Sequence, residues 1–188
     1  MKTITQLTEE DKNMLKNAAR DALMHSINHS EELPVSLSEF PAALHIHQNT
    51  FVTLKYKGQV IGCMGSLEAE RPLVNDVVHN AFSASYHDPR FPDPKSIDPE
   101  KIEVYISLLS AFEEIWFNSE QELLSKIRPG RDGLLMREGQ RQGTFLPAVW
   151  ESIPDPESFL KELKRKTGLP VDYWSDTIKV YRYTTEYW

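Results

Sequence analysis

The single cysteine of the chain, Cys63, lies in a glycine-flanked segment that could carry out nucleophilic chemistry. Gly62 precedes it and Gly65 follows it, and glycine inside a strand often marks a bulge or the close approach of another backbone or a ligand. A thiolate there could attack a substrate if a nearby base or cation lowered its pKa. The alternative is a small thiol buried in a tight gap. Cys63 is therefore a candidate catalytic residue, and the two glycines are candidate ligand-binding residues.

A second candidate is the turn Arg128-Pro129-Gly130-Arg131-Asp132-Gly133. Arg131 and Asp132, together with nearby backbone N–H groups, could hold a carboxylate or a phosphate. The alternative is structural, because Asp-Gly favours a turn and an arginine beside Asp132 would fix it. The spacing of a nucleotide-binding phosphate loop is absent from this turn.

Glu103 and Arg90 form the third candidate pair. Glu103 lies on a predicted strand, opposite to the apolar series, and could move protons in a cleft. Arg90 could bind a ligand or could pair with Glu103 in a structural ion pair. One carboxylate alone defines no mechanism.

The histidines do not predict a metal site. His45 and His47 have the spacing that can chelate from an extended segment, but no third ligand is identifiable. His79 and His87 would lie roughly 12 Å apart on one helix, at 1.5 Å per residue, which is too far to share a metal. We therefore expect surface histidines and no metal or other cofactor.

Periodicity predicts which elements position these residues. Strand-like segments pair as two hairpins, and the helices begin at capping residues or proline and end near glycine or proline. Because the elements do not alternate as regular βαβ units, we expect an α+β fold. The expected arrangement is a mainly antiparallel sheet with helices outside it, in one compact domain covering 1–188. The predicted helices are 8–29, 72–87, 119–127 and 155–168, and the predicted strands are 50–56, 59–66, 102–109, 134–137, 142–146 and 178–185.

Composition argues against several classes of protein. A net charge of −7 would repel a phosphate backbone, so nucleic acid is not an expected partner. No run of residues is apolar enough for a membrane span. A single cysteine suits a reducing compartment, and the polar first segment lacks the apolar stretch of a signal peptide. We therefore expect a cytoplasmic protein.

A series of sequence blocks follows along the chain: Phe51-Val52-Thr53-Leu54, Gly62-Cys63-Met64-Gly65-Ser66-Leu67, Arg71-Pro72-Leu73, Asp88-Pro89-Arg90-Phe91-Pro92, Ile102-Glu103-Val104, Arg128 to Gly133, Leu146-Pro147, Thr167-Gly168-Leu169-Pro170 and Tyr181-Arg182-Tyr183-Thr184. In this order the blocks resemble the AMMECR family, named after the Alport syndrome, mental retardation, midface hypoplasia and elliptocytosis chromosomal region. The resemblance covers nearly the whole chain. It implies one α+β domain and a protein partner that is MEMO-like or a radical-SAM protein, without a settled activity.

One position departs from the family pattern. The family usually has arginine where this chain has Ile61, so a planar cation is replaced by an apolar side chain. If that arginine holds an anion in relatives, this chain must supply the charge from elsewhere, and Arg131 is the candidate.

The sequence leaves two functions open. The first is a binding or accessory module that acts through a protein partner, which the resemblance and the lack of a catalytic cluster favour. The second is an enzyme or small-molecule-binding protein with a cleft between the Cys63 hairpin, the loop 88–92 and the Arg131 turn. Aromatic residues near the C-terminus suit either core packing or a partner surface.

Overall fold

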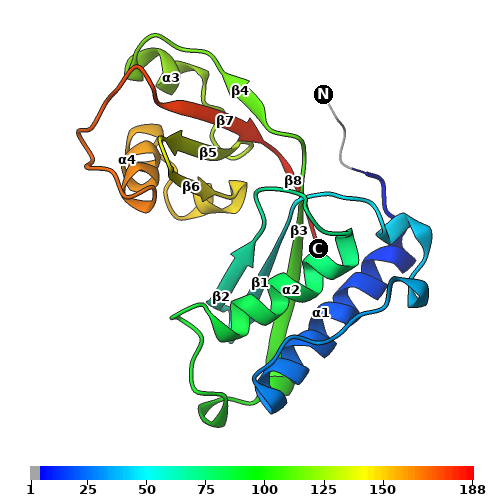
Figure 1. Cartoon of the computed structure of the whole chain (residues 1–188). Coiled ribbons are helices and arrows are strands. Elements are labelled where there is room, and N and C mark those ends of the chain that lie inside the picture. Colours follow the sequence, from blue (N-terminus) through cyan, green and yellow to red (C-terminus); the bar gives the residue numbers. More distant parts are fainter. Residues whose placement is uncertain (1–4) are drawn as a thin grey trace. The chain divides into compact units, whose positions relative to one another are not determined.

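The computed structural model describes residues 5–188, which divide into two compact units (Figure 1). The first unit holds residues 5–109 and 186–188, and the second unit holds residues 110–185. Each unit has a four-stranded antiparallel sheet with helices packed against it. The α+β class, the antiparallel pairing and the two hairpins are confirmed, and the strands are shared between two sheets.

The sheet of the first unit has the strand order β2-β1-β3-β8, and two long helices cover one of its faces. The strands are β1 (Thr50–Tyr56), β2 (Gln59–Gly65), β3 (Ile102–Leu109) and β8 (Thr185–Tyr187), and the helices are α1 (Glu9–His29) and α2 (Leu73–Tyr86). Short 3-10 helices connect them at Leu37–Glu39, Ala42–Leu44, Pro94–Ser96 and Pro99–Lys101.

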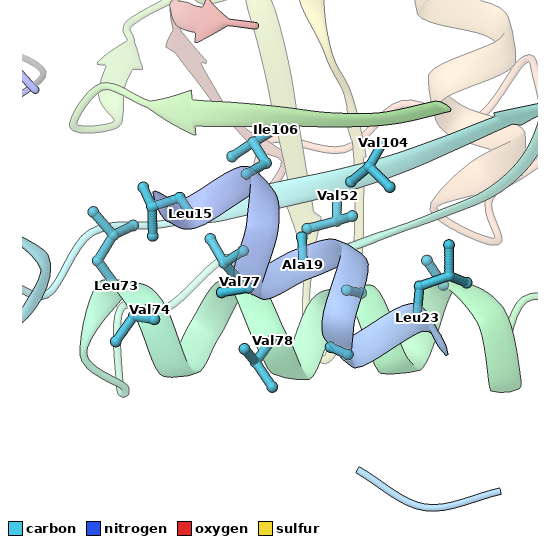
Figure 2. Packing of buried hydrophobic residues seen from close by; sticks show 14 of the residues in the cluster. Leu15, Ala19, Leu23, Val52, Leu73, Val74, Val77, Val78, Val104 and Ile106 are labelled. Carbon is cyan, nitrogen blue, oxygen red and sulfur yellow. The ribbon is translucent and has the colours of Figure 1, made fainter. Parts of the chain in front are cut away.

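Helix α1 begins and packs as its sequence predicts. The Thr8 hydroxyl accepts the Asp11 N–H at 3.1 Å, and the Thr8 N–H donates to the Asp11 carboxylate at 2.9 Å, which completes the capping box. The apolar residues of α1 and α2 pack against the inner face of the sheet (Figure 2). The labelled residues in this core are Leu15, Ala19, Leu23, Val52, Leu73, Val74, Val77, Val78, Val104 and Ile106.

Within residues 5–188, neither α1 nor any other helix is long and apolar enough to cross a membrane.

The β1–β2 hairpin turns where the sequence predicts it. Lys57 and Gly58 both have positive φ, at 52° and 77°, which suits the tight turn between antiparallel strands. The register places Thr53 opposite Cys63, which fixes where the thiol lies on the sheet.

The sheet of the second unit has the strand order β4-β7-β5-β6 and its own apolar core. Phe159 of helix α4 stacks on Trp150 with ring centroids 3.7 Å apart, and both rings are buried. The strands are β4 (Glu113–Ile115), β5 (Gly133–Glu138), β6 (Arg141–Phe145) and β7 (Lys179–Tyr183), and the helices are α3 (Glu120–Lys126), α4 (Pro156–Lys166) and the 3-10 helix Pro147–Glu151.

The single strand predicted over 178–185 is wrong, because the chain changes sheets there. Strand β7 ends at Tyr183 in the second sheet, and β8 begins at Thr185 in the first. Between them, the Thr184 N–H donates to the Ser110 hydroxyl at 2.9 Å, and the Ser110 N–H donates to the Thr184 carbonyl at 2.9 Å. These bonds take the backbone of Thr184 out of the β7 ladder.

Candidate functional site

The Cys63 thiol lies on the face of the first sheet that is opposite to α2. Its Sγ atom is 3.3 Å from the Thr53 hydroxyl on the neighbouring strand, and the residue is half-buried. Gly62, the preceding residue, faces α2, because a Cβ there would stand 2.3 Å from the Ala84 carbonyl oxygen. Successive side chains of a strand point to opposite faces, so the thiol points away from the helix.

The Asp88 carboxylate organises the backbone around Cys63. It accepts the Cys63 N–H at 2.8 Å and the Arg90 N–H at 3.0 Å, and Arg90 also donates from Nε at 2.9 Å and Nη2 at 2.6 Å. Burial by itself would raise the pKa of Asp88, but the hydrogen bonds from the Arg90 side chain, the Arg90 backbone and the Cys63 backbone outweigh it and lower the pKa to about 2. Asp88 is therefore ionised at neutral pH.

Arg90 is held by Asp88 and still reaches solvent. Its side chain is 53% exposed, and hydrogen bonding to Asp88 raises the pKa of the guanidinium, with a smaller electrostatic contribution from Cys63. A fixed cation within electrostatic range of a thiol is the arrangement that favours a thiolate. Of the residues predicted from the sequence, the structure thus brings Cys63 and Arg90 together, with Asp88 between them.

The predicted pairing of Glu103 with Arg90 is wrong. The Glu103 carboxylate accepts the Tyr105 hydroxyl at 2.7 Å, and this hydrogen bond raises the pKa of Tyr105. Glu103 lies on β3, two strands from Cys63, and two strand spacings amount to roughly 10 Å. Nothing in the first unit brings this carboxylate to the thiol.

Gly62 and Gly65 both allow close packing. The Ala84 carbonyl of α2 fills the space where a Cβ on Gly62 would stand. At Gly65 the Phe51 ring fills this space, because it lies 2.2 Å from the ideal Cβ position. Close backbone approach is thus the reason for Gly62, as one of the sequence interpretations expects. Ile61 packs against the first core, which explains an apolar residue in place of the family's arginine.

Arg131 and Asp132 belong to the second unit, where the turn is held by a different arginine. The fully buried Asp132 carboxylate accepts the Arg128 N–H at 3.1 Å and Arg128 Nε at 2.8 Å, and Arg182 Nη1 lies 3.6 Å away. These contacts favour the structural explanation for Asp132. Arg131 is exposed, and its side chain makes no hydrogen bond or ion pair within residues 5–188, so it could still meet an anion.

The histidines are anchored separately. The ring of His45 contacts the Leu37 and Phe40 carbonyls through Nε2, His47 Nδ1 is 3.0 Å from the Ala69 carbonyl, and His79 Nδ1 is 2.8 Å from Glu32. In the described part of the chain, no group of three or more histidine, cysteine or acidic residues is arranged to hold a metal ion.

Sequence reasoning missed a buried polar cluster in the first unit. The Asp76 carboxylate accepts the Thr50 hydroxyl at 2.6 Å, the Ser66 hydroxyl at 2.5 Å and the Asn80 amide at 3.0 Å. Burial raises the pKa of Asp76. The available signal was a pair of polar residues, Asp76 and Asn80, spaced one helical turn apart among apolar residues. This cluster joins β1, the end of β2 and α2.

Sequence reasoning also missed an aromatic groove in the second unit, which we call the Trp116 groove. It has a volume of about 390 Å³ and is lined by Glu114, Ile115, Trp116, Phe117, Asn118, Trp174, Ser175, Asp176, Ile178 and Lys179. Trp116 is 76% exposed, and among the large hydrophobic residues in 5–188 the next most exposed is Tyr86, at 52%. Only Trp174 could have been suspected, from the run of C-terminal aromatics.

Comparison with known proteins identifies the family. A sequence profile of the AMMECR1 family matches residues 16–188, which extends through both units. The chain belongs to the AMMECR1 family. A protein from Methanothermobacter thermautotrophicus is 33% identical over 182 residues, which cover 96% of this chain and 94% of the relative. A protein from Methanopyrus kandleri is 34% identical over 181 residues, covering 90% and 83%.

The fold is shared with a solved structure. The crystal structure of an uncharacterised protein from Pyrococcus horikoshii matches with a TM-score of 0.84 at 31% identity, covering 96% of this chain and 92% of the other. The family resemblance predicted from the sequence blocks is confirmed.

Proposed function

We propose that this AMMECR1-family protein is a binding module that holds a partner polypeptide in the Trp116 groove. The observation that carries the proposal is a tryptophan residue, Trp116, that is 76% exposed and lines a groove together with two further aromatic residues. Tryptophan is enriched among the residues that dominate binding energy at protein interfaces.

The backbone that lines the groove is preorganised by hydrogen bonds to residues of α3. The Lys126 ammonium donates to the Trp116 carbonyl at 2.6 Å, and the Asn118 N–H donates to the Glu122 carboxylate at 2.8 Å. Lys126 and Glu122 are themselves paired at 2.7 Å, so helix α3 holds the backbone that carries the exposed indole. A surface already fixed in its binding conformation loses less conformational entropy when it binds.

Trp174, in the other chain segment that lines the groove, is also held by its neighbours. Its ring lies 5.5 Å from the Phe117 ring, between centroids, and 5.7 Å from the Lys164 ammonium. Lys164 is fully buried and bonds to Glu120 at 2.9 Å, so this cation is held in place beside the Trp174 ring.

The partner that the family resemblance favours is a MEMO-like protein or a radical-SAM protein. The direct experiment measures binding of this chain to each purified protein from the same organism, with Trp116→Ala as the test variant. Tyr86→Ala is the matched control, because Tyr86 is an exposed aromatic residue, at 52%, that belongs to the first unit.

We expect Trp116→Ala to weaken binding on the order of thirtyfold, since truncating a dominant interface residue costs about 2 kcal/mol. Tyr86→Ala should bind as the wild type does. Equal affinity of the wild type and Trp116→Ala for a bound partner would contradict the proposed docking site.

A second candidate function rests on the Cys63, Asp88 and Arg90 cluster of the first unit. Asp88 fixes the Arg90 guanidinium within electrostatic range of the thiol, which suits reaction with, or binding of, a small anionic molecule. The test is the pH dependence of Cys63 alkylation by iodoacetamide in the native protein, with the unfolded protein as reference and Arg90→Gln as the variant.

A native thiol that titrates well below its ordinary pKa of about 8.5, and returns toward it in Arg90→Gln, supports this chemistry. Protection of the thiol until the protein unfolds would make Cys63 a packing residue and leave the binding module as the function.

A further inference from the structure

The lining of the Trp116 groove restricts the kind of polypeptide that fits it. Three aromatic residues line the groove, Trp116, Phe117 and Trp174, and the last two also pack against the core of the second unit. The aliphatic lining is limited to Ile115 and Ile178. The remaining residues are polar or charged. Because all of them lie between residues 114 and 179, the groove is complete within the second unit.

We propose that the occupant is an extended, proline-rich segment of a partner protein that carries a basic residue. This inference rests on the proposed function, since it names the class of polypeptide that the same groove holds.

The aromatic lining favours a polyproline II segment over an amphipathic helix. Such a segment has no internal hydrogen bonds, is largely preformed in solution and docks its prolines between aromatic rings. An amphipathic helix needs an apolar stripe that receives residues i, i+3, i+4 and i+7, and two isoleucines do not supply one. The volume of about 390 Å³ lies near the lower end of the range for ligand pockets, so it suits a few compact side chains.

The charges on the rim favour a basic residue in the segment. Glu114 and Asp176 line the groove, and neither carboxylate has an ion-pair partner within residues 5–188. Lys179 is the opposing cation, which leaves two negative charges against one positive charge. The whole chain carries a net charge of −7, which adds to the attraction for a basic segment.

The experiment titrates the full chain with three synthetic peptides of equal length, followed by the indole N–H signals in NMR spectra. One peptide is proline-rich with an arginine, the second has glutamate in place of that arginine, and the third is an amphipathic helix former. The protein variants are Trp116→Ala, Asp176→Asn and the matched control Tyr86→Ala.

We expect the arginine-containing proline peptide to bind the wild type and Tyr86→Ala, and to bind Trp116→Ala at least tenfold more weakly. The glutamate peptide should bind the wild type roughly two- to fivefold more weakly than the arginine peptide does, as for loss of an exposed ion pair. The arginine peptide should bind Asp176→Asn more weakly than the wild type by a similar factor. The assignment would be overturned if the helical peptide bound the wild type more strongly than the arginine-containing proline peptide does. It would also be overturned if the proline peptides bound Trp116→Ala as strongly as they bind the wild type.

The two proposals fail separately. If Trp116→Ala impairs binding to the purified partner but no proline peptide binds, the polyproline assignment is wrong and the docking site stands. If Trp116→Ala changes neither partner binding nor peptide binding, both are wrong.

Discussion

Replacing Asp88 with asparagine should remove one charge from the hydrogen-bonded loop that holds Cys63 and Arg90. The carboxylate accepts four hydrogen bonds, from the Cys63 N–H and from three N–H groups of Arg90. Each carboxylate oxygen accepts two of these bonds, and an asparagine side chain accepts only through its carbonyl oxygen, so its NH₂ group would face two of these donors. We expect Asp88→Asn to lower the free energy of unfolding by about 2–4 kcal/mol at pH 7.

The dependence on pH gives the sharper test, because its sign and size follow from the pKa of Asp88. The side chain is 4% exposed, and its pKa falls from 3.8 to about 2 in the folded protein. Such a decrease stabilises the folded state by about 2 kcal/mol. Because the folded pKa is the lower one, this stabilisation is fully present well above pH 4 and is lost as the pH falls through about 2.

The assay is urea denaturation of the wild type and Asp88→Asn at several pH values between 7 and 2. All other carboxyl groups are common to both proteins, so the difference in unfolding free energy isolates Asp88. We expect that difference to shrink by about 1–2 kcal/mol between pH 5 and pH 2. A difference that stays constant over this range would refute the reasoning, as would a carboxyl pKa near 4 for Asp88 by NMR titration.

Two pairs of substitutions, one pair in each unit, test the packing by denaturation. Gly62→Ala should lower the free energy of unfolding by about 1–3 kcal/mol, because the new methyl group would stand 2.3 Å from the Ala84 carbonyl oxygen. Gly58→Ala is the control: its methyl group meets open space, so it should lower the free energy of unfolding only by the strain of its positive φ, about 1 kcal/mol. Equal losses in the two variants would show that the strand relaxes around the methyl group. Glu120→Gln should destabilise the second unit by about 1–3 kcal/mol, because it leaves the buried Lys164 ammonium without its carboxylate partner. Lys164→Met should destabilise this unit less, because it removes the buried charge itself. The opposite order of the two variants would contradict the ion-pair argument.

Local signals in the sequence were sufficient for most elements. The helix predicted over 8–29 and the turn between the strands predicted over 50–56 and 59–66 depend on residues close together in the chain, and both were predicted correctly. The short strand β4 and the change of sheet at Thr184 were missed. Three residues give too little periodicity for a prediction, and the change of sheet depends on hydrogen bonds with Ser110, far away in the sequence.

The candidate site was predicted only in part, for the same reason. Cys63 and Arg90 were singled out separately by type and neighbours, but their connection depends on Asp88, a buried carboxylate whose partners are set by tertiary structure. Glu103 was paired with the wrong cation because strand alternation gives a side chain's face and not its neighbour. Trp116 carried no pattern that distinguished it from a core tryptophan.

The hydrogen bonds between Ser110 and Thr184 have a topological consequence. They join the first residue of the second unit to the residue before its last, so this unit is an insertion whose two ends lie close together. The first unit is correspondingly built from two pieces of chain, and its sheet takes its last strand from the C-terminus. A short turn in place of residues 110–185 would join the two pieces across a small gap at little entropic cost.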